Sequence, residues 1–294
     1  MKLRGDVMGT LAFLGPKGTF TQRAAYLYME EFRDESFRGV EYPSIPELIS
    51  AVDRGEAEQG VVPIENSQEG SINVTLDMLT HQVDLYIQFE IILPIVHNLL
   101  VSHGTTMNDI TKILSHPQAI AQCRSFLERN LKGVEIHYTL STAEAAKRVV
   151  GTSDSAAIST VEAAQAFGLR VLKKNIHDNG YNSTRFVVLG KEIPPPTGRD
   201  KSSIVFMVDH RPGSLYKILE IFARFNINLT KIESRPAKTM LGQYLFYIDF
   251  EGHRQQDIIR RILETISNSA MYYKYLGSYP YKSYGHRDIC PSQV

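Results

Sequence analysis

The sequence predicts an α/β protein whose first part folds as two lobes and whose last part is a separate α+β domain. Three observations predict this fold class. Apolar, strand-like runs alternate with helical runs over residues 11–190, the pattern of mostly parallel sheets covered by helices. Residues 91–101 form a long apolar stretch between two such α/β halves, and the chain returns to the first half through residues 176–189. These two crossings predict two lobes joined by a hinge. Three successive prolines within residues 192–201 then predict an extended spacer.

Helix boundaries in the first part are marked by capping signals. Segments beginning at Ser44, Ser141 and Ser159 each fit a capping box, in which a hydroxyl and a carboxylate three residues later satisfy free amides of the first turn. Gly55 and Gly168 supply matching stops, because glycine readily adopts the left-handed conformation that ends many helices.

The segment after the prolines has its own order of elements. Its apolar runs predict strand, helix, strand, strand, helix and strand, the βαββαβ arrangement of ferredoxin-like α+β domains. The Tyr-rich tail from residue 279 onward is expected to be a surface segment. The predicted divisions are 1–192 for the two-lobed part (lobe one about 10–90 and 184–192, lobe two about 93–180), 193–201 for the linker, 202–280 for the second domain and 281–294 for the tail.

Composition argues against several classes of function. The 294 residues suffice for two or three compact units, and 32 basic against 32 acidic side chains give a formal net charge of zero. Nothing in this balance favours nucleic acid or an anionic membrane. Cys123 and Cys290 form no CxxC pair, which predicts free thiols in a reducing cytosol. No signal peptide or membrane-spanning run is recognised, so a soluble cytoplasmic protein is expected.

The tripeptide Thr184-Arg185-Phe186 suits the binding of a small anion that loses a hydroxyl. A threonine hydroxyl donates to an oxygen without adding charge, and the planar guanidinium of arginine matches a carboxylate. By itself the tripeptide also fits an ordinary strand entry. Thr184 can bond to backbone, and Arg185 can point from the alternate face of the strand into a structural ion pair. Both alternatives stay open for Arg185.

A glycine-containing loop near the N-terminus is a candidate anion cradle. In the run Gly15-Pro-Lys-Gly-Thr-Phe-Thr21, glycines allow backbone amides to approach a ligand, and the following helix offers its positive end. Thr19 and Thr21 add hydroxyls. A purely structural reading also fits, because an N-cap accounts for Thr21 and a tight turn accounts for Gly18.

A second polar turn follows the strand that begins near residue 60. Asn66 and Ser67 offer neutral donors and acceptors at the carboxyl end of that strand, where open α/β sheets usually hold ligands. A carboxylate at this place would repel an anion, so Glu65 is expected to organise the loop rather than to contact substrate.

Four blocks in this order resemble prephenate dehydratase. They are Leu11–Ala25, Gly60–Ser71, Ser115–Cys123 and the Thr-Arg-Phe tripeptide. The resemblance implies a bilobal catalytic domain similar to the type 2 periplasmic binding proteins, with the active site in the cleft between the lobes. Asp209–Tyr216 and Asn228–Pro236 look like the two signature segments of the phenylalanine-responsive ACT domain, which is typically fused to this enzyme.

The implied reaction is the decarboxylating dehydration of prephenate to phenylpyruvate in phenylalanine biosynthesis. Aromatisation drives it, so the protein has to hold a dianion and assist departure of the hydroxyl. The family's essential threonine matches Thr184, the predicted catalytic residue, as a hydrogen-bond donor or proton relay. The predicted substrate contacts are Arg185, Phe186, Thr19, Thr21, Asn66 and Ser67. His116 is expected to fix its loop or line the cleft, with Ser115 capping the following helix.

The resemblance also implies an allosteric phenylalanine site, usually built across a dimer interface, that inhibits the enzyme. Its predicted residues are Gly213, Ser214, Leu215, Glu233, Ser234, Arg235 and Pro236. In ACT-like domains that bind nothing, Gly213 would serve only its turn and Arg235 only a surface pair.

The expected partners are prephenate, phenylalanine and further copies of the chain, in a homodimer or homotetramer formed through ACT and catalytic domains. No nucleic acid, membrane, metal or cofactor is expected, because the nine histidines show no ligand spacing and the reaction needs no redox carrier. Arogenate dehydratase and a non-catalytic solute-binding protein are the alternatives.

Overall fold

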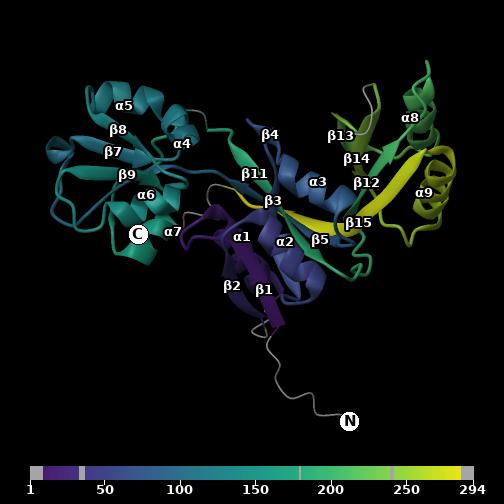
Figure 1. The fold of residues 1–294 in the computed structure, drawn as a ribbon, viewed down its shortest axis with the longest axis horizontal. Coiled ribbons are helices and arrows are strands. Elements are labelled where there is room, and N and C mark those ends of the chain that lie inside the picture. The colour runs from purple at the N-terminus through teal and green to yellow at the C-terminus, as the bar shows by residue number, and fades with distance from the viewer. Residues whose placement is uncertain (1–8, 33–36, 179, 239–241, 286–294) are drawn as a thin grey trace, which may run out of the picture.

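The computed structural model describes residues 9–32, 37–178, 180–238 and 242–285. They form three bodies in a row, with lobe one in the middle, lobe two on one side and the C-terminal domain on the other (Figure 1). The chain passes from lobe one to lobe two after strand β5 and returns in strand β11. Both crossings predicted from the apolar runs are therefore present.

Lobe one is a sheet covered on both faces by helices. Its elements are β1 (Gly9–Leu14), α1 (Phe20–Phe32), β2 (Phe37–Tyr42), α2 (Ile45–Arg54), β3 (Gln59–Asn66), β4 (Gly70–Ser71), α3 (Asn73–His81), β5 (Tyr86–Pro94) and β11 (Ser183–Gly190). Leu11 and Phe13 of β1 pack with α1, whereas the intervening Ala12 packs with α2 and α3. Strands β1, β2 and β3 are parallel, and β11 runs antiparallel between β3 and β5.

Lobe two is a smaller α/β unit with a five-stranded sheet in the order β10-β6-β9-β7-β8. Its elements are β6 (Asn98–Val101), the 3-10 turn η1 (Met107–Asp109), β7 (Lys112–Ser115), α4 (Pro117–Gln122), α5 (Arg124–Asn130), β8 (Glu135–Tyr138), α6 (Thr142–Arg148), β9 (Ser155–Ser159), α7 (Val161–Phe167) and β10 (Arg170–Lys173). All five residues of β9 are buried, as expected for a central strand covered on both faces.

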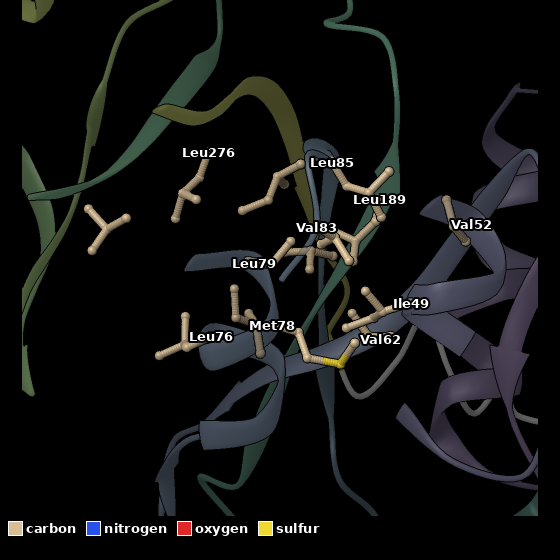
Figure 2. Close-up of a cluster of buried hydrophobic side chains, with 14 of the residues drawn as sticks. Ile49, Val52, Val62, Leu76, Met78, Leu79, Val83, Leu85, Leu189 and Leu276 are labelled. Atoms are coloured by element: carbon tan, nitrogen blue, oxygen red, sulfur yellow. The ribbon is translucent and has the colours of Figure 1, made fainter. Parts of the chain in front are cut away.

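The C-terminal domain has the predicted βαββαβ order. Its elements are β12 (Asp200–Met207), α8 (Ser214–Arg224), β13 (Leu229–Pro236), β14 (Tyr244–Glu251), α9 (Asp257–Ser269) and β15 (Tyr272–Ser283). The two helices cover one face of the sheet, and side chains of the other face join the core of lobe one. Leu79 of α3 and Leu276 of β15 belong to this shared core (Figure 2). The two domains therefore pack through buried apolar side chains.

The tail expected at the surface continues the last strand. Beyond Pro280, β15 leaves its pairing with β12 and runs parallel to β5, which joins both domains into one sheet. The order of strands in this sheet is β13-β14-β12-β15-β5-β11-β3-β1-β2. Tyr279 is fully buried, so the expectation of a surface segment was wrong for this residue. The prediction for Cys290 lies outside the described residues.

Most predicted helix caps are present, but in helices α4 and α7 the capping residue lies one position later than predicted. Ser44 and Ser141 accept hydrogen bonds from the amides three residues later, and Gly55 and Gly168 end their helices in the left-handed conformation. Helix α7, however, is capped by Thr160 instead of Ser159. Similarly, His116 rather than Ser115 caps α4, because the Ser115 hydroxyl donates to the carbonyl of Ile158 in the neighbouring strand.

Candidate active site

A cleft of about 410 Å³ lies between the two lobes, and several predicted residues meet in it. Lobe one contributes Thr19, Thr21, Asn66, Thr184 and Phe186; the crossings contribute Ile95, His97 and Asn182; lobe two contributes His116, Gln118, Gln122, Ser141 and Thr142. The N-terminal loop and the Thr184 hydroxyl thus line one cleft although they are far apart in sequence. Ser67 is exposed and does not line it: its hydroxyl donates to the carbonyl of Tyr181 and accepts from the amide of Ser183.

Thr184 and Asn66 are partners across strands β11 and β3. The Asn66 Oδ1 accepts from the amides of Gln68 (2.9 Å) and Glu69 (3.1 Å), so its Nδ2 must point the other way. That Nδ2 donates to Thr184 Oγ1 at 2.9 Å. Because Thr184 Oγ1 accepts this bond and makes no other within the described residues, its own proton is free to be donated into the cleft.

A chain of neutral side chains continues from Asn66 toward lobe two. Asn66 Nδ2 also donates to Asn182 Oδ1 (2.8 Å), which fixes Asn182 Nδ2 as the donor to Gln122 Oε1 (3.0 Å). Gln122 Oε1 lies 2.9 Å from His97 Nε2, so that nitrogen carries the imidazole proton. The remaining Gln122 Nε2 is buried and has no partner among the described residues.

Burial keeps His97 neutral. Removal of the imidazole from water lowers the pKa of His97 to about 4, although the hydrogen bond with Gln122 acts in the opposite direction. The cleft lining contains no Lys or Arg side chain among the residues that the structure describes. The polar side chains that line it carry hydroxyls, amides, the imidazoles of His97 and His116 and one carboxyl group, that of Glu69.

The N-terminal loop holds its two threonines differently. Thr19 caps α1, because its hydroxyl accepts from the Gln22 amide at 3.2 Å and donates to the carbonyl of Leu14 at 3.0 Å. The capping role considered for Thr21 thus belongs to Thr19. Thr21 is 5% exposed and lines the cleft one residue inside the positive end of the helix.

Gly18 joins the two lobes. Its φ is +86°, its carbonyl accepts from Thr160 Oγ1 of lobe two at 2.7 Å, and an added Cβ would lie 2.7 Å from the Cα of Ala163. The tight turn foreseen for Gly18 is present, and the absence of a side chain also allows lobe two to approach.

Arg185 faces away from the cleft. Since side chains alternate along a strand, Thr184 and Phe186 line the cleft while Arg185 points toward the C-terminal domain. Its Nη1 lies 2.6 Å from Asp249 and 3.2 Å from Glu65, and its Nε lies 2.6 Å from Glu90. Of the two alternatives for Arg185, the structural ion pair is the arrangement seen, and the guanidinium does not line the cleft. Glu65 was expected to organise its loop; its carboxylate instead pairs with Arg185 and with Lys231 of the C-terminal domain.

The residues predicted to bind phenylalanine divide into two groups. Gly213 has a φ of +82° and open space around its Cα, and it leads into α8. On β13, at the edge of the sheet, Ser234 and Pro236 are exposed. In contrast, Glu233 accepts from Ser71 and pairs with Lys231, and Arg235 pairs with Asp77 of lobe one.

Three residues of the site were missed from sequence. His97 interrupts the apolar crossing at residues 91–101, and Gln122 lies within the Ser115–Cys123 block. Asn182 lies two residues before Thr184. Each could have been singled out as a polar side chain next to a recognised motif.

The fold and the cleft define a two-lobed enzyme with a fused regulatory domain. The profile of prephenate dehydratase matches residues 11–194, and the ACT domain profile matches residues 202–268. The bifunctional chorismate mutase/prephenate dehydratase of Aquifex aeolicus is 42% identical over 92% of this chain and 73% of its own. The chain belongs to the prephenate dehydratase family, and it is a lyase that converts prephenate to phenylpyruvate.

Solved structures agree with this assignment. Prephenate dehydratase from Arthrobacter aurescens in complex with L-Phe superposes with a TM-score of 0.83 at 33% identity, covering 97% of this chain and 92% of its own. GqqA, described as a novel type of quorum quenching acylase, has a TM-score of 0.81 at 29% identity, covering 93% and 98%. Among the described residues, no helix has the length and apolarity needed to cross a membrane, and no cluster of three candidate metal ligands occurs.

Proposed function

We propose that Thr184 assists loss of the prephenate hydroxyl by donating its proton in a hydrogen bond to the departing oxygen. The observation that carries this proposal is the bond from Asn66 Nδ2 to Thr184 Oγ1, which uses an acceptor site of the hydroxyl and leaves its proton available. As the ring carboxylate leaves as carbon dioxide, its bonding electrons enter the ring and the carbon–oxygen bond breaks. The oxygen takes up one proton, which in net comes from solvent water, and departs as water, while Thr184 ends the step with its own hydroxyl intact.

A cleft whose described lining contains no Lys or Arg side chain suits this chemistry. The ring carboxylate must lose its charge, so a cation beside it would stabilise the bound substrate more than the transition state. Thr21 and the N-terminal end of α1 are the proposed contacts of the side-chain carboxylate, because backbone amides and the helix dipole favour an anion there. The unpartnered Gln122 Nε2 is a further proposed donor to substrate, and Phe186 packs against the ring.

Replacing Thr184 by valine tests this role, since valine keeps the shape and removes the donor. Loss of one donor at a developing charge costs about 100- to 1,000-fold in kcat. We expect Thr184→Val to lower kcat by that factor while substrate still binds, measured by phenylpyruvate formation from prephenate. Wild-type turnover by this variant would remove Thr184 from the mechanism. Comparing prephenate with arogenate in the wild-type enzyme determines which substrate is preferred.

The ACT domain is proposed to bind phenylalanine and to inhibit the enzyme. The turn at Gly213 offers free backbone beside α8, and β13 exposes its outer edge, so a second copy of the chain can complete the site there. A homodimer or homotetramer in the cytoplasm is the proposed assembly. Gly213→Val should weaken inhibition by phenylalanine without changing uninhibited turnover. An identical inhibition curve for this variant would place the effector elsewhere.

A further inference from the structure

Strands β11 and β3 carry two adjacent cross-strand residue pairs whose side chains lie on opposite faces of the sheet. Thr184 and Asn66 form one pair and face the cleft. Arg185 and Glu65 form the next pair and face the C-terminal domain. The register between β11 and β3 shifts immediately after Arg185. Backbone pairing is disrupted at such an irregularity, so side-chain contacts have a larger part in fixing the strand there.

The C-terminal domain supplies two of the polar partners that hold Arg185. Asp249 of β14 lies 2.6 Å from Nη1, and the Tyr279 hydroxyl of β15 accepts from Nη2 at 3.0 Å. The Ser203 hydroxyl of β12 bridges these two groups: its Oγ donates to Asp249 Oδ1 at 2.5 Å and lies 2.5 Å from the Tyr279 hydroxyl. The group is shielded from water, since the Arg185 and Asp249 side chains are 12% and 8% exposed. Weak screening makes their attraction strong.

Both ends of this contact are charged. Burial by itself would raise the pKa of the Asp249 carboxyl, but Arg185, the Ser203 hydrogen bond and Lys231 outweigh it and hold that pKa below its ordinary value. Burial also opposes the charge on Arg185, yet the carboxylates around it raise its pKa well above the ordinary value. The ion pair therefore persists at neutral pH.

We infer that Asp249 of the ACT domain is a positioning residue for the dehydration, because it anchors Arg185 and thereby sets the place of Thr184 in the cleft. The inference rests on the catalytic role proposed for Thr184. It makes the regulatory domain a structural part of the active site. A 1 Å misplacement of a reacting group can cost about 100-fold in rate, so a small movement of β11 is sufficient to change turnover.

Asp249→Asn is the direct test, because asparagine keeps the shape and removes the charge. The cluster contains the cations Arg185, Lys201 and Lys231 and the anions Glu65, Glu90, Asp249 and Glu233. After the substitution three charges of each sign remain, so no cation is left unpaired. Glu90 and Glu65 still hold Arg185 within lobe one.

We expect Asp249→Asn to lower kcat by at least about ten-fold with little change in KM, because substrate binding groups stay in place while the donor shifts. Tyr279→Phe removes only the hydroxyl and should lower kcat in the same direction by less. Asp84→Asn is the matched polar control. It breaks the 3.2 Å contact with Lys274 across the same domain interface, where Asp84 is 98% exposed, and should leave kcat unchanged.

Ile248→Val controls for stability. Ile248 precedes Asp249 on β14 and is fully buried, so its truncation weakens the same domain without touching the ion pairs. Each variant is assayed below its thermal transition, and turnover is expressed per folded protein. A folded Asp249→Asn with wild-type kcat, or with a loss no larger than that of Ile248→Val, overturns the inference. If Asp249→Asn does not fold, wild-type kcat in Tyr279→Phe overturns it. Wild-type kcat in Thr184→Val would instead refute the catalytic role on which it rests.

Discussion

The polarity of the bond between Asn66 and Thr184 can be reversed by Asn66→Asp. Asparagine offers Thr184 a donor at 2.9 Å, whereas an aspartate oxygen at that place can only accept. The Thr184 proton would then be held by the carboxylate instead of facing substrate. The contacts of Oδ1 with the Gln68 and Glu69 amides are retained, so the turn that follows β3 should keep its shape.

The expected loss in kcat follows from the hydrogen bond between the Thr184 hydroxyl and the new carboxylate, because this bond must break before the proton can reach substrate. A hydrogen bond to a charged group contributes about 1.5–3 kcal/mol, which corresponds to a loss of roughly 10- to 150-fold in kcat. The added negative charge should also raise KM for the dianionic substrate. Steady-state kinetics of phenylpyruvate formation separates the two effects. Gln68→Ala, which alters an exposed neighbour and keeps its backbone amide, is the control.

A double variant decides whether Asn66 acts through Thr184. When valine replaces Thr184 there is no proton for the aspartate to capture, so Asn66→Asp should lower kcat little further. Losses of kcat that multiply in the double variant would refute this coupling. An Asn66→Asp enzyme with wild-type kcat would refute the assigned direction of the hydrogen bond.

Two further predictions concern the contact between the lobes and the hinge. Gly18→Ala should destabilise the protein by at least about 1 kcal/mol and raise KM, because its φ of +86° and the nearby Ala163 exclude a side chain; an unchanged thermal transition and KM would contradict this. The unfolded chain protonates His97 near pH 6.5 and the folded chain only near pH 4, so this residue's contribution to stability is complete above pH 6.5 and falls by about 3 kcal/mol on acidification to pH 4. Denaturant unfolding across this range should show a shallower decline for His97→Gln than for the wild type, and parallel declines would exclude His97 as the cause.

The sequence was sufficient for elements that local chemistry controls. The order of strands and helices, the glycine stops at Gly55 and Gly168, and the meeting of Thr184 with the N-terminal loop all follow from local patterns combined with a family resemblance. The shift from Ser159 to Thr160 as cap of α7 was harder to foresee, because both residues carry a hydroxyl that can cap a helix.

Long-range packing explains what the sequence did not reveal. The alternating tyrosines and polar residues after Leu276 fit an exposed strand, yet β15 changes neighbours there and Tyr279 becomes buried against lobe one. One of the partners of Arg185 comes from the same domain contact. Strand alternation places Arg185 opposite Thr184, where Glu65 and Glu90 of lobe one lie. The third carboxylate, Asp249, comes from β14 of the other domain and could not be foreseen from local pattern.

The burial of Arg185 on the far side of the strand explains how a cation can be the sequence neighbour of Thr184, the proposed catalytic residue, in an enzyme whose substrate is a dianion. A guanidinium within the cleft would grip the carboxylate that must leave without charge, and would thereby favour the ground state. Facing Glu90, Asp249 and Glu65 instead, Arg185 has its charge balanced locally. In the proposed arrangement its fixed geometry orients β11, while the neutral side chains of Thr184 and Asn66 line the cleft. The same side chain in the opposite direction would hold substrate and slow its decarboxylation.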